Sequence, residues 1–349
     1  MKKLKTVISG LGRIGWQFHI KGVAGNDGFD LAAVCDPLAE RRDEANEKYS
    51  VKGYNNFREM IDAERPELTV IASPTHLHAE QAVYALERGS DVFLDKPMAR
   101  DLAEADTIIA AKENSGRKLM MYQPHRYTAI TQKIKEIIES GIIGDVYMIK
   151  TSACNYVFRN DWQSFKKYGG GMLNNSGAHS IDMTLYLSGS AAARVTGHMR
   201  RVASAGDADD VVKILIETVG GVTIDIDINM AAAVPLPHTI IYGSCGAISE
   251  FYKNDERRLL VRYFDPSERG KTTASDKLAA EGRRYVTAAP ENWKETEYIV
   301  ENEDGLGYYD KCYDYFALGD PPFVDVMESR EVMRVIAECR KSAGWSQDL

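Results

Sequence analysis

A glycine-rich segment near the N-terminus constrains the fold of this chain more than any other feature. The segment Gly10-Leu11-Gly12-Arg13-Ile14-Gly15 follows an apolar, strand-like run and opens a stretch with helical periodicity. In that setting the first glycine permits a tight turn, the second lets the backbone approach a pyrophosphate, and the third lets the helix pack closely on the strand. We therefore expect a dinucleotide to be bound by Gly10, Gly12, Arg13, Ile14 and Gly15.

Alternating strands and helices fill the first third of the chain. Apolar runs predict strands at residues 6–9, 31–35, 68–72, 92–94 and 118–122. Helical patterns lie at residues 14–23, 38–49, 78–88 and 102–113. Short connections between such elements require right-handed crossovers. We therefore expect an α/β Rossmann domain with a doubly wound parallel sheet over residues 1–124.

A different pattern begins after about residue 125. Residues 223–228 alternate between apolar and polar side chains, which is typical of a strand with one exposed or partner-covered face. Other strand-like runs lie at residues 146–151, 194–201, 211–219, 222–229 and 239–242, and helices are expected at residues 128–140 and 328–342. Residues 125–349 thus predict an α+β domain for substrate binding and oligomerisation, with a large, mostly antiparallel open sheet and a C-terminal helix that packs on the first domain. Residues 253–300 are charged and irregular, and the sequence does not place helices or strands within them.

Composition and charge exclude several classes of protein. The 349 residues carry a net charge of -8, which disfavours nucleic acid as a partner because phosphate binding needs a clustered positive face. No run approaches the roughly 20 apolar residues of a membrane span, and the first apolar run is too short for an export signal. The five cysteines are scattered and have no metal-binding spacing. We expect a cytoplasmic protein with reduced thiols, no membrane contact and no metal site.

Asp36 ends the second predicted strand, where this fold places the residue that meets the adenosine ribose. A carboxylate there accepts hydrogen bonds from ribose hydroxyls and repels a 2′-phosphate, so NAD is favoured over NADP. Arg41 and Arg42 are the counter-argument, because they are near enough to reach a phosphate. Alternatively, they are solvated charges on the next helix.

The loop Ser73-Pro74-Thr75-His76-Leu77-His78 follows the next apolar strand, at the edge of the sheet where ligands bind. We expect the cofactor crevice to be lined by Ser73, Pro74, Thr75 and His78. Two histidines without a nearby carboxylate or cysteine do not predict a metal site.

Asp95-Lys96-Pro97 ends another core strand at the same edge. A lysine at the end of a buried strand costs desolvation unless a polar or anionic group meets it. One interpretation is a surface lysine in a turn before Pro97. The other is a donor beside the cofactor that stabilises alkoxide character on a substrate oxygen as hydride leaves.

Together these segments resemble the Gfo/Idh/MocA family of NAD(P)-dependent oxidoreductases, which act mostly on sugars and cyclitols. The resemblance covers nearly the full length of the chain. Besides the glycine segment and Lys96-Pro97, it is carried by Tyr122-Gln123-Pro124-His125-Arg126, Gly141-Ile142-Ile143-Gly144, Arg159-Asn160-Asp161-Trp162, Gly169-Gly170-Gly171 and Tyr242-Gly243-Ser244-Cys245-Gly246. The family usually has glutamate before the lysine, and here that acid is Asp95.

The resemblance implies roles for four residues. Lys96 contacts the reacting hydroxyl, and His179 is the general base in oxidation and the general acid in reduction. Asn175 stands where the family often has aspartate; its amide carries no charge but can hydrogen-bond the substrate or orient His179. Asp182 lies on the same helix face as His179 and is expected to orient it or to support the structure.

A substrate pocket is expected from the positions of Arg126, Tyr156, Asp161, Trp162 and Asp182. An aromatic ring suits the apolar face of a polyol, and a carboxylate accepts its hydroxyls. A tryptophan of the core is the alternative interpretation of Trp162.

The sequence therefore predicts an NAD-dependent dehydrogenase of a sugar, sugar derivative or cyclitol. Its partner would be a small-molecule polyol, and the resemblance implies a homodimer or homotetramer. Two alternatives remain open: an NAD-dependent glycoside hydrolase that oxidises its substrate transiently, and a non-catalytic sensor that binds NAD and a sugar. The presence of both Lys96 and His179 argues against the sensor, which has no need of a proton-transfer pair.

Overall fold

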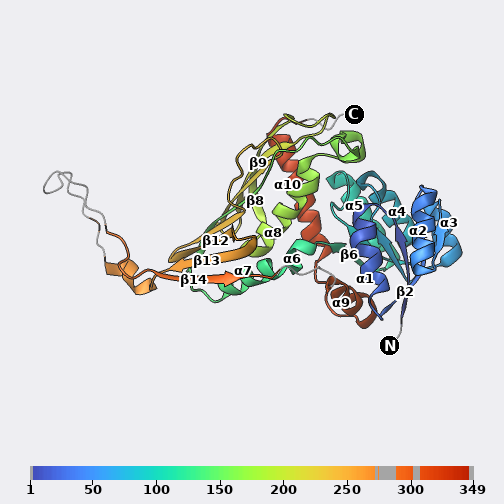
Figure 1. Cartoon of the computed structure of the whole chain (residues 1–349), viewed down its shortest axis with the longest axis horizontal. Coiled ribbons are helices and arrows are strands. Elements are labelled where there is room, and N and C mark those ends of the chain that lie inside the picture. Colours follow the sequence, from blue (N-terminus) through green and yellow to red (C-terminus); the bar gives the residue numbers. More distant parts are fainter. Residues whose placement is uncertain (1–2, 272–273, 275–287, 302–306, 346–349) are drawn as a thin grey trace.

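Six parallel strands form the first sheet (Figure 1). The computed structural model describes residues 3–271, 274, 288–301 and 307–345. The strands follow the order β3-β2-β1-β4-β5-β6, in which each neighbouring pair is parallel. Their bounds are β1 (Leu4–Ser9), β2 (Phe29–Cys35), β3 (Lys52–Tyr54), β4 (Leu68–Ile71), β5 (Asp91–Asp95) and β6 (Leu119–Tyr122). This order confirms the doubly wound parallel sheet.

Helices lie on both faces of this sheet (Figure 1). They are α1 (Ile20–Ala24), α2 (Ala39–Tyr49), α3 (Phe57–Glu64), α4 (His78–Glu87) and α5 (Leu102–Ser115). The expected helix at residues 14–23 is instead a π-helical turn (Gly15–His19) followed by α1. The elements β3 and α3 are not predicted from the sequence. Strand β3 has three residues, none of them buried, so no hydrophobic pattern marks it.

The second sheet has eight strands in the order β14-β13-β12-β11-β7-β10-β9-β8. Their bounds are β7 (Val146–Cys154), β8 (Ala192–Arg200), β9 (Val211–Thr218), β10 (Thr223–Asn229), β11 (Thr239–Gly243), β12 (Gly246–Lys253), β13 (Glu256–Tyr263) and β14 (Lys294–Ile299). Neighbouring strands are antiparallel except β7 and β10, which are parallel. The mostly antiparallel sheet is therefore confirmed.

Strands β13 and β14 lie within residues 253–300, where the sequence does not place helices or strands. Their charged side chains pair across the two strands: Arg258 contacts Glu297 at 3.1 Å, and Arg262 contacts Glu295 at 3.2 Å. Such pairs let solvent-facing strands carry charge without a strong apolar pattern. Residues 272–273 and 275–287 of this segment lie outside the described residues.

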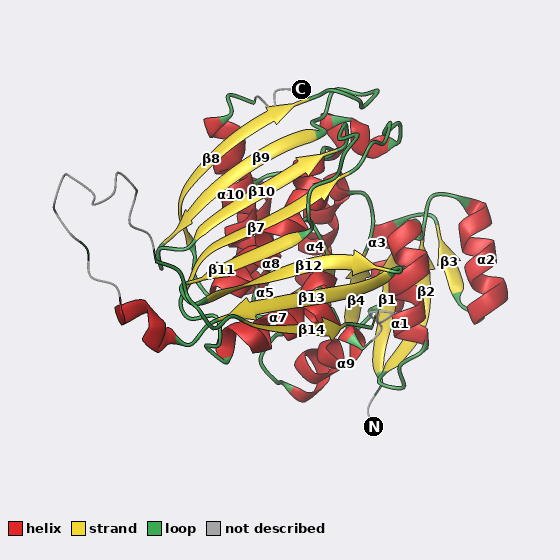
Figure 2. Ribbon diagram, turned by 60° about the vertical axis from the view of Figure 1, so that its left-hand side comes forward, coloured by secondary structure: helices red, strands yellow, loops and turns green. Residues whose placement is uncertain are grey.

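Helices cover one face of the second sheet (Figure 2). These include α8 (Ala178–Ser188) and α10 (Val326–Ser342); α6 (Pro124–Tyr127) and α7 (Ala129–Glu139) connect the two sheets. The opposite face carries no helix within the described residues (Figure 2). Helix α10 also reaches the first sheet's helices, since Nε of Arg330 lies 2.6 Å from Oδ1 of Asp106 in α5. None of the helices in the described residues is long and apolar enough to cross a membrane.

A short helix late in the chain, α9 (Tyr308–Tyr313), packs against the first sheet. Tyr308 and Tyr309 are fully buried. The hydroxyl of Tyr308 donates to the carbonyl of Met121 at 2.8 Å, and the hydroxyl of Tyr309 lies 2.5 Å from Nδ1 of His19. Residues near the C-terminus thereby complete the core of the N-terminal sheet.

Candidate active site

A cavity of about 520 Å³ lies where the carboxyl edge of the first sheet meets the helical side of the second. We call it the central cavity. Its wall includes the glycine loop, the ends of β4 and β5, helix α6, and segments between β7 and α8. Residues that were expected at a site and line it are Gly12, Arg13, Ile14, Ser73, Thr75, His78, Lys96, Asp161, Trp162, Asn175 and His179.

The glycine loop opens onto the central cavity through Gly12. A Cβ atom on Gly12 would meet nothing within 4 Å, so a ligand has room to approach the backbone here. Gly10 has a φ of +92°, and a Cβ on it would lie 2.5 Å from the carbonyl oxygen of Ala72. Gly10 and Gly15 therefore shape the loop from behind, while Gly12 and Arg13 face the space where a pyrophosphate would bind.

Asp36 is buried and holds the glycine loop. Its Oδ2 accepts from the backbone N–H of Leu11 at 2.8 Å, and its Oδ1 accepts from the N–H of Leu38 at 3.0 Å. Arg41 lies 3.3 Å from Oδ2, and Arg42 donates to the Asp36 carbonyl at 2.7 Å. Both arginines thus contact Asp36 rather than extending as free solvated charges. A ribose hydroxyl would have to share a carboxylate that already orders the loop.

His78 joins two loops instead of offering a polar atom to a ligand. Its Nδ1 lies 2.9 Å from the carbonyl of Pro97, and its Nε2 lies 2.8 Å from the carbonyl of Ser73. The ring lines the cavity wall, and both of its nitrogens face backbone carbonyls. Pro74 does not line the cavity, and the described residues contain no cluster of three or more metal-binding side chains.

Lys96 projects from the end of β5 and meets Asn175 of the π-helical turn Leu173–Gly177. Its Nζ donates to the backbone carbonyl of Asn175 at 2.8 Å and to its Oδ1 at 3.1 Å. Burial lowers the pKa of Lys96 to about 8, opposed by the charge of Asp95. Burial raises the pKa of Asp95 to about 7. The ammonium group is therefore held by two uncharged oxygens, near a carboxyl whose charged form is disfavoured by burial.

His179, in the first turn of α8, stacks on His125 of α6. The two ring centroids are 3.9 Å apart and the rings are inclined by 12°. Burial lowers the pKa of His179 well below its ordinary value, and the positive charges of His125 and Lys96 act in the same direction. The imidazole is consequently neutral near pH 7 and able to accept a proton.

The triple-glycine segment positions Asn175. Gly171 has a φ of +102°, and a Cβ on it would lie 2.2 Å from Oδ1 of Asp209. Oδ2 of Asp209 accepts from the N–H of Leu173 at 2.7 Å, which fixes the start of the turn that carries Asn175. The side-chain amide of Asn175 then donates to Oε1 of Gln163 at 3.2 Å.

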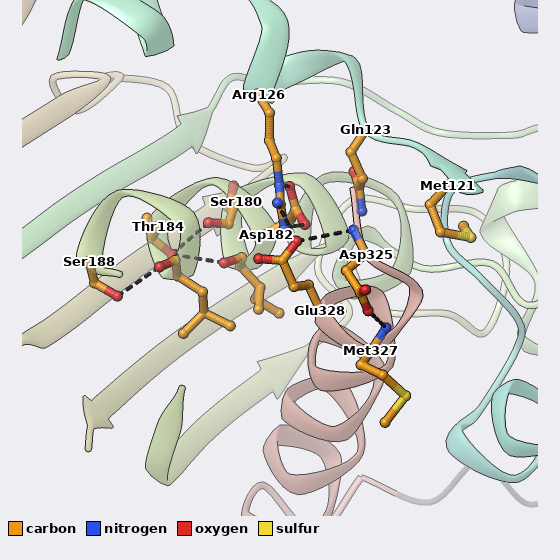
Figure 3. Close-up of polar contacts among 12 residues, drawn as sticks. Met121, Gln123, Arg126, Ser180, Asp182, Thr184, Ser188, Asp325, Met327 and Glu328 are labelled. Atoms are coloured by element: carbon orange, nitrogen blue, oxygen red, sulfur yellow. Dashed lines mark hydrogen bonds and ion pairs between the residues drawn. The ribbon is translucent and has the colours of Figure 1, made fainter. Parts of the chain in front are cut away.

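Arg126 and Asp182 pair with each other outside the cavity wall (Figure 3). Nε and Nη2 of Arg126 donate to the two carboxylate oxygens of Asp182, each at 2.7 Å. Nη1 of Arg126 lies 2.7 Å from Oε2 of Glu328 at the start of α10. Because these charges satisfy one another, the expected substrate contacts of Arg126 and Asp182 are not supported. The pair connects α6 to α8.

Tyr156 also lies outside the cavity wall. Its side chain is 53% exposed, and it contacts Phe158 edge to face. The wall does include Tyr122, His125, Thr128, Arg159 and Gln163, for which no role is predicted from the sequence. His125 and Arg159 stand inside segments that carry the family resemblance, which is the only signal that points to them.

Two family models match the chain. The model described as "Oxidoreductase family, NAD-binding Rossmann fold" matches residues 4–123, and the model of the GFO/IDH/MocA C-terminal domain matches residues 131–249. The chain belongs to the Gfo/Idh/MocA family. The first sheet of this Gfo/Idh/MocA protein is accordingly the NAD-binding Rossmann domain of the family.

Several dehydrogenases are similar in sequence to part of this chain. An inositol 2-dehydrogenase of Salmonella paratyphi B is 33% identical over 150 residues, which are 42% of this chain and 44% of the relative. A D-glucoside 3-dehydrogenase of Escherichia coli is 27% identical over 190 residues, which are 53% of this chain and 54% of the relative. The chain thus spans about half the length of these relatives.

Solved structures share the complete fold of this Gfo/Idh/MocA protein. An NAD-binding protein from Listeria innocua superposes with a TM-score of 0.81 at 23% identity, covering 98% of this chain and 95% of that chain. An aldose-aldose oxidoreductase from Caulobacter crescentus, complexed with glycerol, has a TM-score of 0.77 at 20% identity and covers 98% of each chain. Both sheets therefore follow a fold found in other proteins.

Proposed function

We propose that this protein is an NAD-dependent dehydrogenase that oxidises a secondary hydroxyl of a sugar, sugar derivative or cyclitol. The observation that carries the proposal is the meeting of Lys96, His179 and the open backbone at Gly12 in one cavity. Relatives named inositol 2-dehydrogenase and D-glucoside 3-dehydrogenase support the substrate class.

His179 and Lys96 have different roles in the proposed reaction. NAD, when bound, supplies the hydride acceptor for oxidation and the hydride donor for reduction. His179 takes the hydroxyl proton in oxidation, for which its neutral form is suited. The ammonium of Lys96 donates a hydrogen bond to the same oxygen and stabilises the negative charge that develops on it. Asn175 supports this arrangement because both oxygens that hold Lys96 belong to it.

The substrate side of the central cavity suits a polyol. Asp161 and Trp162 line it, and the guanidinium of Arg159 lies 3.5 Å from the carboxylate of Asp161. Hydroxyl groups can accept from the arginine and donate to the carboxylate, while the indole covers an apolar sugar face. NAD is the proposed cofactor rather than NADP, because Asp36 places negative charge at the end of β2.

We further propose that the protein acts in the cytoplasm as a homodimer or homotetramer. The supporting observation is the helix-free face of the second sheet, on which Leu215 is 41% exposed between the buried Ile214 and Ile216. A face of this size with exposed apolar side chains is suited to a second copy of the chain.

The test is the formation of reduced cofactor by the purified protein with cyclitols, aldoses and sugar acids, with NAD and NADP in parallel. We expect turnover with one substrate group and NAD, and a loss of about 100-fold or more in Lys96→Ala with NAD binding retained. Turnover by Lys96→Ala equal to that of the unaltered protein contradicts the assignment. Glycoside hydrolysis that needs only catalytic amounts of NAD would establish the hydrolase instead.

A further inference from the structure

The orientation of His179 has no hydrogen bond to fix it. In the described part of the chain, its Nδ1 atom is buried and has no hydrogen-bond partner. A catalytic imidazole usually donates from the nitrogen that faces away from the substrate to a carboxylate or carbonyl, which holds the ring in one plane. Another contact has to supply that constraint here.

The face of the ring supplies such a contact. His125 stacks on His179 with a centroid distance of 3.9 Å and an angle of 12° between the ring planes. Both rings line the central cavity. Rotation of His179 about its χ2 torsion would break this stack.

A neighbouring ion pair holds the two helices that carry the stack. Arg126 directly follows His125 on α6, and Asp182 lies one helical turn after His179 on α8. The bidentate contact between Arg126 and Asp182 is almost fully buried, with side chains 3% and 1% exposed (Figure 3). A two-point attachment of α6 to α8 therefore fixes the position of His125 relative to His179.

We propose that His125 is a positioning residue for His179. Its stacked ring orients His179, because no carboxylate among the described residues is hydrogen-bonded to that histidine. This inference rests on the proposed dehydrogenase function. After His179 accepts a proton, its ring remains stacked on His125, which stays neutral because burial lowers its pKa to about 4. The stack thus serves both protonation states of the base.

Charges around the pair limit it to one proton. Burial lowers the pKa of His125 to about 4, and the positive charges of Lys96 and Arg257 act in the same direction. The other charged side chains on the cavity wall are Arg13, Asp95, Arg159 and Asp161. With these four cations nearby, double protonation of the stack is disfavoured.

The decisive comparison is between two replacements of similar volume. His125→Phe keeps a flat ring without nitrogens, whereas His125→Leu removes the ring. We expect His125→Leu to lower kcat about 10- to 100-fold and His125→Phe to retain it within about 3-fold, because misplacement of a catalytic group costs rates of this order. The Kd for NAD should be unchanged in both. The control is His238→Ala, which removes an exposed histidine that does not line the cavity.

A second readout does not depend on turnover. Ring ¹H–¹³C correlation spectra resolve the seven histidines, and His179 is assigned by the signal lost in His179→Gln. The His179 signal should stay sharp in His125→Phe and shift or broaden in His125→Leu.

Each outcome separates the possibilities. Equal kcat and unchanged His179 signals in His125→Leu overturn the positioning role. An equal loss in both variants overturns it too, because the imidazole nitrogens would then matter rather than the stack. If no polyol is oxidised by the unaltered protein, the dehydrogenase proposal fails, while the spectra still show whether His125 orients His179.

Discussion

The ammonium of Lys96 is held by two oxygens of an uncharged residue. Asn175 provides both, and it gives the lysine no opposite charge. The negative group near Nζ is Asp95, whose pKa is itself raised to about 7 by burial. The charge of Lys96 therefore changes with pH near pH 8.

This arrangement predicts a pH dependence. The pKa of Lys96 is lowered to about 8, so the ammonium is present below that pH and is lost as the pH rises through it. We expect kcat/KM to fall above about pH 8. Asn175→Asp places a carboxylate against Nζ, raises the lysine pKa and moves the falling limb to higher pH by about one unit. Initial rates from pH 6 to 10 measure the decline at high pH in both proteins. If the decline occurs at the same pH in Asn175→Asp, a group other than Lys96 causes it.

Asp36 orders the glycine loop through its hydrogen bond to Leu11, and we propose that the same carboxylate also meets the ribose of the cofactor. Asp36→Ala should therefore weaken NAD binding as well as raise the relative use of NADP. Asp36→Asn keeps an acceptor for the N–H of Leu11 but removes the charge. We expect it to lose less NAD affinity than Asp36→Ala while gaining in NADP preference. Titration of both cofactors by fluorescence tests this, and an unchanged NADP-to-NAD ratio counts against Asp36 as the selector.

At the scale of elements, the glycine loop offers a matched pair of substitutions. Gly12→Ala adds a methyl group into open space, so the fold and melting temperature should be retained. The same methyl group occupies the approach to the pyrophosphate, and NAD affinity should fall at least 10-fold. Gly10→Ala forces a φ of +92° on alanine and a contact of 2.5 Å with Ala72, so it should destabilise the fold itself. Calorimetry with and without NAD distinguishes the two, and unimpaired NAD binding by Gly12→Ala would show that the cofactor binds elsewhere.

The ion pair between α6 and α8 is the clearest stability element near the site. Asp182→Asn removes the buried charge partner of Arg126, leaves only the half-exposed Glu328, and should cost about 3–5 kcal/mol of unfolding free energy. Glu328→Gln should cost at most about 1 kcal/mol, because Glu328 is 49% exposed. Urea unfolding measures both changes in free energy, provided that the slope of unfolding free energy against urea concentration is the same in the variants. Equal effects of the two substitutions would mean that burial does not decide the energetics here.

Elements with strong local patterns were predictable from the sequence, and weakly patterned ones were not. Buried strands such as β4 and β5 stand out as apolar runs between turns. The strands β13 and β14 do not, because their charged faces are balanced by partners across the sheet. Lys96 and His179 were found through motifs, and the cavity brings them together. The pairing of Arg126 with Asp182, 56 residues apart, has no local signature. The stack between His125 and His179 has no local signature either. The domain boundary after residue 124 stays a prediction.

At the scale of the whole molecule, we expect subunits to associate through the face of the second sheet that no described helix covers. Lys150 and Asp225 form an ion pair on it at 3.7 Å, beside Leu215. We expect a dimer or tetramer in sedimentation velocity, and a smaller species when Leu215→Asp places an unpaired charge in the interface. His238→Ala is the control. A monomer at all concentrations for the unaltered protein would contradict the proposed assembly.

Helix α9 has a consequence for synthesis on the ribosome. Tyr308 bonds to the carbonyl of Met121, which is 187 residues earlier in the chain. At usual elongation rates the first sheet therefore leaves the ribosome roughly 10–40 s before the tyrosines that complete its core are made. During that interval the nascent Rossmann domain exposes an apolar surface around Phe93 and Tyr122, which Tyr308 later covers. A chaperone that shields this surface would act on the unfinished chain and have nothing to bind once α9 docks.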